Sequence, residues 1–197
     1  MPTTYARAYA YINSWLNVFH DDWCMSLSLQ MHELGHNLNM GHSNEGGETY
    51  EDQVGIMGYS YKSSNSPRFC FNAAKSWQTG WYKDKEVTVS SSGATSCFAG
   101  EIHGVAEYPA ATTVLVKIRG VDADHFVGFN AKRGINVGTQ DAYNQVTAVS
   151  RPRGGRDTYA ESSLEAKLSA GESYVTPSGY PSFRRGVELL QDIKLTS

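Results

Sequence analysis

Bulky hydrophobic residues first gather in two short segments near the N-terminus, residues 8–12 and 15–19. Within them, bulky positions alternate or cluster around small polar residues, which predicts two short strands joined by a turn. Apolar positions then recur at helical spacing through residues 24–38, and Asp21 or Asp22 is expected to be the N-cap of that helix. The beginning of the chain is therefore predicted to form a strand pair followed by a helix.

A polar loop and a second, shorter helix are predicted next. Residues 43–56 are rich in Gly, Glu, Asn and Ser, which predicts a loop. Its acidic side chains lack the regular ligand spacing of a calcium-binding loop, which favours a solvated acidic surface over a calcium site. These side chains are Glu45, Glu48, Glu51 and Asp52. Asn72 is expected to cap a helix that extends to about Trp81 and turns an apolar face toward a core.

From residue 86 the pattern changes to short β-rich runs separated by Gly, Pro, Asn and Asp. The runs are residues 87–90, 101–107, 113–118, 126–130, 145–150 and 186–195. Short strands with turn residues between them are typical of an antiparallel β-sandwich. The prediction is therefore an α+β protein, with a first domain in residues 1–85 and a β-sandwich domain in residues 86–197.

The predicted first helix carries the residues with the clearest chemistry, in the sequence HELGHNLNMGH of residues 32–42. His32 and His36 are four residues apart, so both side chains lie on one helix face and can bind the same metal ion. Glu33 lies next to the first ligand, where its carboxylate can act as general base on a water molecule. On a straight helix His42 would lie about 9 Å beyond His36, so the chain must turn back to bring it to the metal.

Asn39 and Gly41 are predicted to make that turn. Glycine enters left-handed backbone conformations freely, and asparagine is among the few other residues that do. Three histidines leave one coordination position open, which is typical of a catalytic rather than a structural zinc site. A bare HExxH sequence also occurs by chance in unrelated helices, but the third histidine and the turn residues favour a zinc site formed by His32, His36 and His42.

A second signal lies in residues 55–59, Gly-Ile-Met-Gly-Tyr, which predict a tight turn bearing Met57. By itself Met57 would be an ordinary core residue, because methionine commonly fills gaps. Together the two motifs resemble those of the metzincin zinc endopeptidases, whose signature is HExxHxxGxxH followed by a Met-turn beneath the metal. Asn39 stands where that pattern has glycine. Because asparagine tolerates the same backbone region, we interpret this difference as a tolerated replacement.

A closer resemblance is to the gametolysin-like metallopeptidases of algae, including diatom homologues. It is strong over residues 5–82 and weaker in the rest of the chain. It rests on residues 21–24, 32–42, 55–61 and 70–82. The resemblance implies a truncated metzincin-like catalytic domain and a secreted endopeptidase, extracellular or in the cell wall, that acts on matrix or cell-wall glycoproteins.

Two interpretations of Tyr59 stay open at this point. In some metzincins a tyrosine two residues after the Met-turn methionine ligates zinc or donates a hydrogen bond to the developing oxyanion, and the resemblance implies this role for Tyr59. Alternatively, Tyr59 and Tyr61 line the wall of the site, with half-buried rings and hydroxyls in water.

The composition and net charge of the chain argue against some classes of partner. The chain has 197 residues, enough for one large or two small domains, and its formal net charge of −3 argues against a nucleic-acid partner. No apolar stretch approaches the roughly twenty residues of a membrane span, and no signal-peptide pattern follows Met1.

Because metzincins that resemble this chain carry most of a twisted sheet before the zinc helix, we expect the chain to be truncated at its N-terminus. The sequence leaves the oligomeric state open.

The cysteines, Cys24, Cys70 and Cys97, do not identify the compartment, because an odd count leaves one without an internal partner. One interpretation is a Cys24–Cys70 disulfide, which would tie the entry of the zinc helix to the segment after the Met-turn. The other interpretation is three ordinary buried thiols.

Two functional hypotheses follow from these patterns. The first is a zinc-dependent metalloendopeptidase with one catalytic Zn²⁺, protein or glycoprotein substrates and Glu33 as general base. The second is an inactive zinc-binding fragment that binds protein or glycan through its β-sandwich, since absent strands would remove the edge along which an extended substrate pairs. Chelator-sensitive cleavage of an added peptide distinguishes the two.

Overall fold

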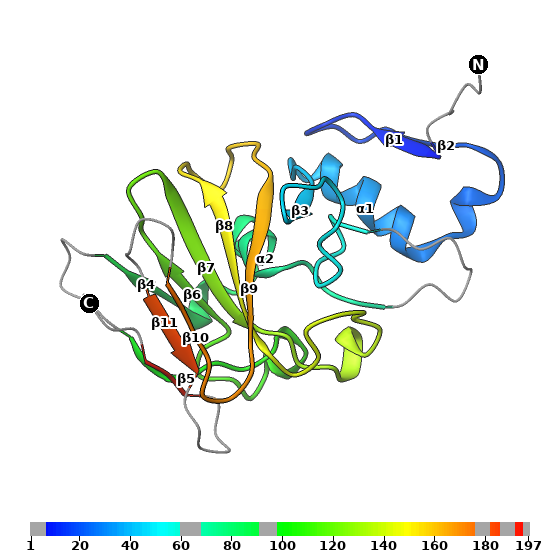
Figure 1. Ribbon diagram of the computed structural model, residues 1–197. Coiled ribbons are helices and arrows are strands. Elements are labelled where there is room, and N and C mark those ends of the chain that lie inside the picture. Colours follow the sequence, from blue (N-terminus) through cyan, green and yellow to red (C-terminus); the bar gives the residue numbers. More distant parts are fainter. Residues whose placement is uncertain (1–6, 60–67, 91–97, 176–181, 186–191, 195–197) are drawn as a thin grey trace.

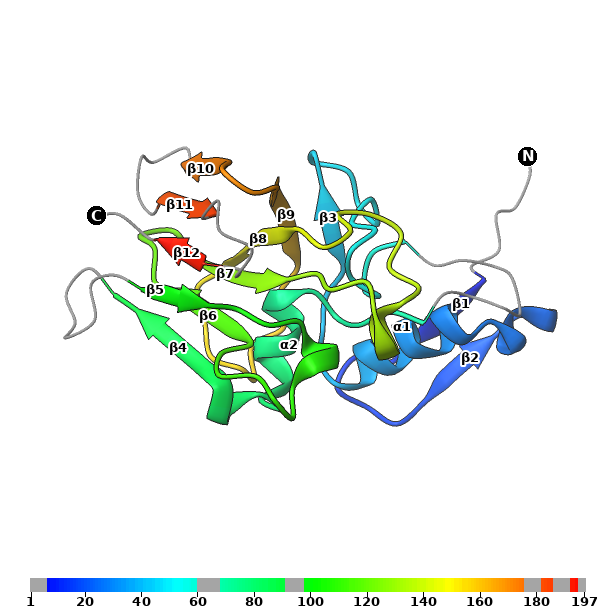
Figure 2. The same cartoon turned by 90° about the horizontal axis from the view of Figure 1, so that it is seen from below.

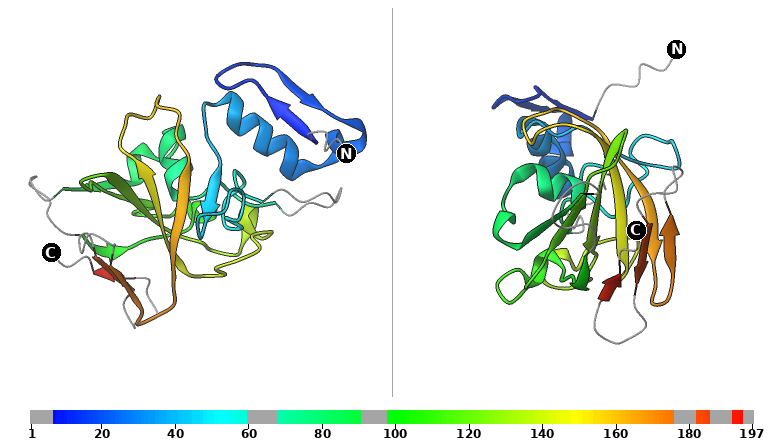
Figure 3. Two further views of the ribbon diagram at one scale, coloured as in Figure 1. Left: turned by 45° about the horizontal axis from the view of Figure 1, so that its top comes forward. Right: turned by 90° about the vertical axis from the view of Figure 1, so that its left-hand side faces the viewer.

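The computed structural model describes residues 7–59, 68–90, 98–175, 182–185 and 192–194 (Figure 1). The first two strands, β1 (Ala8–Ala10) and β2 (Asn17–Phe19), pair antiparallel and confirm the predicted strand pair. They form a two-stranded sheet that lies along helix α1 (Figures 1 and 3).

Helix α1 spans Leu27–Asn37 and is preceded by a 3₁₀ turn, η1 (Asp21–Met25). The N-cap is Ser26, whose Oγ accepts a hydrogen bond from the Leu29 amide at 3.4 Å. The expectation that Asp21 or Asp22 caps this helix is therefore wrong. Both aspartates belong to the 3₁₀ turn, and Ser26 has the extended backbone that an N-cap needs.

The largest sheet has six strands in the order β3-β9-β8-β7-β6-β4. Its strands are β3 (Ser43–Glu45), β4 (Glu86–Val89), β6 (Leu115–Ile118), β7 (Ala123–Phe129), β8 (Val146–Pro152) and β9 (Ser162–Leu168). The centre is antiparallel as predicted, but the edge pairs β3–β9 and β4–β6 are parallel. Long connections join the strands of each edge pair, so they meet without a hairpin.

Both faces of this sheet are buried, because neighbouring residues along its strands enter two different hydrophobic clusters. Val116 and Val127 belong to one cluster, whereas their neighbours Leu115 and Phe126 belong to the other. Helix α2 (Ala73–Thr79) contributes to the second cluster with Ala73, Ala74 and Trp77. The predicted N-cap Asn72 is confirmed: its side chain accepts a hydrogen bond from the Lys75 amide at 3.0 Å.

A second sheet has four strands in the order β10-β11-β12-β5 (Figure 2). They are β10 (Ser173–Val175), β11 (Ser182–Arg185), β12 (Asp192–Lys194) and β5 (Ala99–Glu101). This sheet and α2 lie on opposite faces of the six-stranded sheet (Figure 3). The predicted strand at 101–107 is wrong beyond Glu101, since Val105–Glu107 form the 3₁₀ turn η3. Most of the predicted run 186–195 lies outside the described residues.

The structure is of mixed α and β composition, while the β-sandwich and the domain boundary stay predictions. Residues on both sides of that boundary share the six-stranded sheet, because β3 pairs with β9. They also share a hydrophobic cluster, in which Trp77 meets Phe126 with ring centroids 5.1 Å apart. The site described next is therefore anchored to the sheet that follows it in sequence.

Candidate metal centre

The end of α1 turns as the sequence predicts. Asn39 has a left-handed backbone with φ 66°, its amide donates to the His36 carbonyl, and the Met40 amide donates to the Gly35 carbonyl at 3.0 Å. This pair of bonds is a Schellman motif with Asn39 at the residue that must be left-handed. Gly41 is not in the left-handed region, so the predicted reason for this glycine is wrong. A Cβ there would lie 2.7 Å from the Ala160 carbonyl oxygen, so glycine allows the Ala160 backbone to approach closely.

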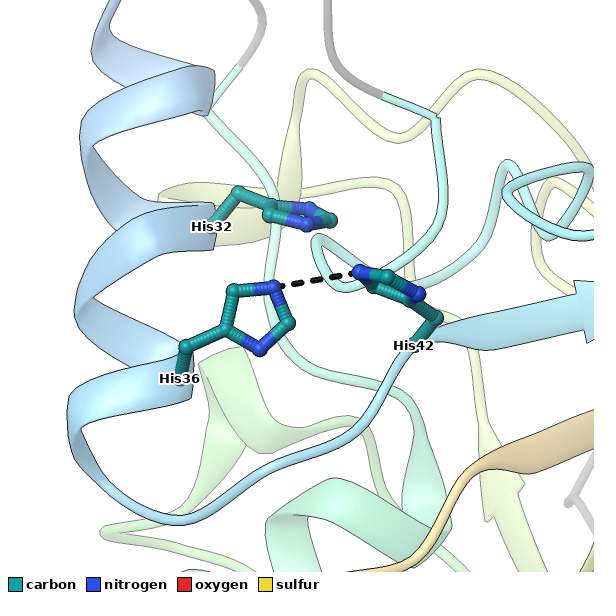
Figure 4. A group of neighbouring side chains, drawn as sticks. All are labelled: His32, His36 and His42. Carbon is teal, nitrogen blue, oxygen red and sulfur yellow. Dashed lines mark hydrogen bonds between the residues drawn. The ribbon is translucent and has the colours of Figure 1, made fainter. Parts of the chain in front are cut away.

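The turn brings the three predicted ligands together (Figure 4). One ring nitrogen from each of His32, His36 and His42 lies within 4.8 Å of the others. The Nε2 atoms of His36 and His42 are 3.1 Å apart. Two nitrogens bound to one tetrahedral zinc ion would be about 3.3 Å apart. The three imidazoles therefore fit a single zinc ion.

The other ring nitrogen of each histidine faces an oxygen atom. His32 Nδ1 lies 3.0 Å from the Ile56 carbonyl, and His36 Nδ1 lies 2.8 Å from the Met40 carbonyl. His42 Nδ1 lies 4.0 Å from a carboxylate oxygen of Glu161. A carbonyl can only accept, so Nδ1 of His32 and His36 must carry the proton and leave the Nε2 lone pair for a metal.

Burial keeps these imidazoles neutral at pH 7. Burial, with a smaller electrostatic contribution from neighbouring His36, lowers the pKa of His32 to about 3 and the pKa of His42 to about 4. The pKa of His36 is also lowered, mainly by burial. Because a metal binds the neutral imidazole, this environment favours metal binding over protonation.

Glu33 lies in the same cleft as the three histidines and is buried. Its Oε2 atom makes no hydrogen bond with any described residue. Burial raises the pKa of this carboxyl group to about 7. A buried carboxyl group whose pKa lies near neutrality, with one oxygen that accepts no hydrogen bond from the described residues, has the properties of a general base.

Met57 lies in the predicted tight turn, which is closed by a hydrogen bond from the Gly58 amide to the Gly55 carbonyl at 2.9 Å. The side chain is fully buried against α1, since a Cβ added at Gly35 would lie 2.1 Å from its sulfur atom. The neighbouring Ile56 carbonyl is the one that faces His32. The turn therefore supports both the helix and one of the three imidazoles.

The expected acidic surface is wrong for Asp52, which is fully buried. Its carboxylate accepts hydrogen bonds from the amides of Val54 and Gly55 and from the Asn72 side chain. Its backbone carbonyl accepts from the Tyr59 amide at 3.1 Å. Burial raises the pKa of Asp52 to about 6, although these hydrogen bonds oppose the rise. Asp52 thus holds the loop that carries Met57.

A cleft of about 600 Å³ opens over the histidines and Glu33. Strand β1, Tyr50, Tyr59 and Tyr159 contribute to its lining. Tyr59 is 42 % exposed. That its hydroxyl ligates zinc or donates a hydrogen bond to the oxyanion stays a prediction. No sequence pattern indicated Tyr50, whose backbone is left-handed with φ 71° and whose ring centroid lies 4.2 Å from that of His42. A strained aromatic residue beside a site is a functional candidate.

Cys24 and Cys70 are both free thiols, which contradicts the interpretation in which they form a disulfide. Cys24 is exposed in the 3₁₀ turn before α1, whereas the amide of Cys70 is bound by the Asn136 side chain at 2.9 Å. Burial raises the pKa of the Cys70 thiol to about 12. Cys97 lies outside the described residues.

Comparison with protein families identifies the relationship. The model of the family described as gametolysin peptidase M11 matches residues 8–116, more than half of the 197-residue chain. The chain belongs to the gametolysin peptidase family. A search of curated proteins and a search of solved structures gave no match.

The family match covers the three histidines, Glu33 and the Met57 turn of this gametolysin-family chain, and it ends in β6. Tyr159 and Glu161, which reach the same site, lie beyond it. As a member of a peptidase family the chain acts on protein substrates. None of the helices in the described ranges has the length and apolar character that a membrane span needs.

Proposed function

We propose that this gametolysin-family chain is a zinc-dependent endopeptidase in which His32, His36 and His42 hold the metal and Glu33 is the general base. One observation carries the proposal: Nδ1 of each imidazole faces an oxygen atom, and one ring nitrogen from each converges within 4.8 Å. Metal-binding histidines almost always have such an oxygen partner on the second ring nitrogen.

In the proposed reaction the chain positions a peptide in the cleft and moves a proton. Zinc held there would polarise the scissile carbonyl and lower the pKa of an attacking water toward about 7. Glu33 takes the proton from that water and passes it to the leaving amine. Tyr59, which lines the cleft, donates a hydrogen bond to the developing oxyanion.

The proposed substrates are extracellular proteins, with matrix or cell-wall glycoproteins as the class that the family resemblance implies. The open cleft and the strand β1 along it suit an extended peptide. An extracellular or cell-wall location belongs to the same proposal.

The test is a peptide digest with wild-type protein and two carboxylate variants. Glu33→Gln keeps the size of the side chain but cannot accept the proton, so kcat is expected to fall by about 10²–10⁴-fold while the zinc content stays the same. Glu165→Gln, on exposed β9 surface, is the matched control and is expected to retain full activity. A chelator should stop wild-type cleavage, and added zinc should restore it.

Full activity of Glu33→Gln would exclude Glu33 as the base. A zinc-loaded wild-type protein that cuts no peptide would instead support a zinc-dependent binding module.

A further inference from the structure

The third ligand lies at the start of a strand pair that joins distant parts of the chain. Strand β3 pairs parallel with β9, and the register places Ser43 opposite Ser162. His42 and Glu161 immediately precede these two residues, and the Ser162 amide donates to the His42 carbonyl at 3.0 Å. The backbone pairing therefore fixes His42 beside Glu161.

Further side-chain bonds support this pairing. The Ser43 and Ser162 hydroxyls lie 3.1 Å apart, and both accept from the Asn72 amide group. All three side chains are buried. The N-cap residue of α2 is thus hydrogen-bonded to both strands of the pair, and these bonds hold the backbone next to His42 in place.

Among the three imidazoles, His42 differs in the partner of its Nδ1 atom. The other two face backbone carbonyls, whereas His42 Nδ1 faces Glu161 Oε1 at 4.0 Å. The second oxygen of that carboxylate, Oε2, accepts a hydrogen bond from Asn44 Nδ2 at 2.8 Å. Asn44 therefore anchors the carboxylate and directs its other oxygen toward His42.

We propose that Glu161 is a positioning residue for the third metal ligand, holding the proton on His42 Nδ1 so that Nε2 faces the metal. The proposal rests on the proposed zinc site. At 4.0 Å a small rotation of the half-exposed carboxylate, or one bridging water, completes the hydrogen bond. A carboxylate in this place also raises the basicity of the imidazole and places negative charge near the metal.

The consequence is that the metal centre extends beyond the helix, the turn and the residues of the family match. Glu161 comes from the connection between β8 and β9, past the matched residues 8–116. Metal affinity should therefore depend on a residue that immediately precedes β9 and belongs to no zinc-binding motif.

The experiment measures the zinc affinity of the full metal-stripped chain by competition with a chromophoric chelator. Glu161→Gln is expected to bind zinc about tenfold more weakly, the lower end of the loss seen when such second partners are removed. Glu165→Gln, four residues further along the chain in β9, is the control and should match wild type. Asn44→Ala should weaken zinc binding less, and it should add nothing in the Glu161→Gln background.

Two further measurements distinguish a positioning role of Glu161 from a role in the stability of the fold. The unfolding midpoint of metal-free Glu161→Gln should equal that of wild type. In zinc-loaded protein, nitrogen NMR should show that the His42 Nδ1 proton exchanges with solvent faster in Glu161→Gln.

Zinc affinity of Glu161→Gln within about twofold of wild type would overturn the proposal and leave the zinc peptidase intact. A weaker affinity that tracks a lowered metal-free midpoint would also overturn it, because Glu161 would then act only by stabilising the strand pair. If wild type itself fails to bind zinc, the proposed function fails, and this inference fails with it.

Discussion

Helices α1 and α2 are built alike but differ in the surroundings of their buried residues: those of α2 belong to a hydrophobic cluster, whereas those of α1 line a cleft. Each begins with a side-chain N-cap, Ser26 or Asn72, and each is followed by a left-handed residue, Asn39 or Gly80. In α2 the buried residues Ala73, Ala74 and Trp77 join the hydrophobic cluster against the six-stranded sheet, and the polar Lys75, Ser76 and Gln78 are buried beside them. In α1 the buried residues are mostly polar: Ser28, His32, Glu33 and His36 accompany Leu29 and Gly35.

Two of the three leucines of α1 are exposed: Leu27 is 37 % exposed and Leu34 is 43 % exposed, while Leu29 is buried. A helix that buries polar groups and exposes apolar ones gains little from the hydrophobic effect. The comparison indicates that α2 stabilises the fold, whereas α1 is held in place by caps, turns and the Met57 loop so that its polar face can serve the cleft.

Removing a large apolar side chain from each helix is the strongest way to break this comparison. Trp77→Ala in α2 empties a site where the ring packs against Phe126 and lies under the Lys117 ammonium group. The free energy of unfolding should fall by about 3–5 kcal/mol. Leu34→Ala in α1 should change it by less than about 0.5 kcal/mol. Urea unfolding of metal-free protein measures both, and equal losses would refute the division of roles.

The two N-caps sharpen the comparison. Asn72→Ala removes the cap and three further hydrogen bonds, including the one to the buried Asp52 carboxylate, and should cost about 3 kcal/mol. Ser26→Ala removes the 3.4 Å capping bond from the Leu29 amide and should cost about 1 kcal/mol. The same urea series tests the difference. A larger loss of unfolding free energy for Ser26→Ala than for Asn72→Ala would mean that α1, rather than α2, stabilises the fold.

Both helices bury ionisable side chains, and Lys75 on α2 predicts a pH dependence of stability. Burial lowers the pKa of Lys75 to about 7, and its Nζ donates to the Ala160 carbonyl at 2.7 Å. Above pH 7 the folded chain holds this amine neutral while the unfolded chain protonates it up to about pH 10. Unfolding then takes up a proton, so stability rises with pH, by at most about 1.4 kcal/mol per unit.

The control for this prediction is Lys75→Met, which removes the titrating group and leaves the Ala160 carbonyl its bond from the Gly41 amide. Between pH 7.5 and 9 the wild-type free energy of unfolding should gain about 2 kcal/mol relative to this variant. Parallel pH curves for the two proteins would show that Lys75 does not titrate in this range.

Local patterns in the sequence predicted much of the site. The helical spacing of His32 and His36 and the left-handed preference of Asn39 depend only on neighbouring residues, and the structure bears out both. The Asn72 cap and the strand pair β1–β2 are local in the same sense.

Features that depend on distant segments were not predicted. Strand β9 has the sequence SSLEAKL, whose Glu, Ala and Lys disfavour strands, and it forms through pairing with β3 and β8. The nearness of Glu161 to His42 follows from that pairing. The burial of Asp52 also follows from contacts with Asn72, 20 residues away. Composition alone indicated solvent exposure for such acidic residues.

The most direct test of the proposed metal centre is the zinc content of the purified chain after dialysis against metal-free buffer, measured by mass spectrometry. Three convergent neutral imidazoles predict about one zinc per wild-type chain, the same for Glu33→Gln, and none for His36→Ala. Wild-type chain without zinc, or equal zinc in His36→Ala, would contradict the assignment of His32, His36 and His42 as the metal ligands.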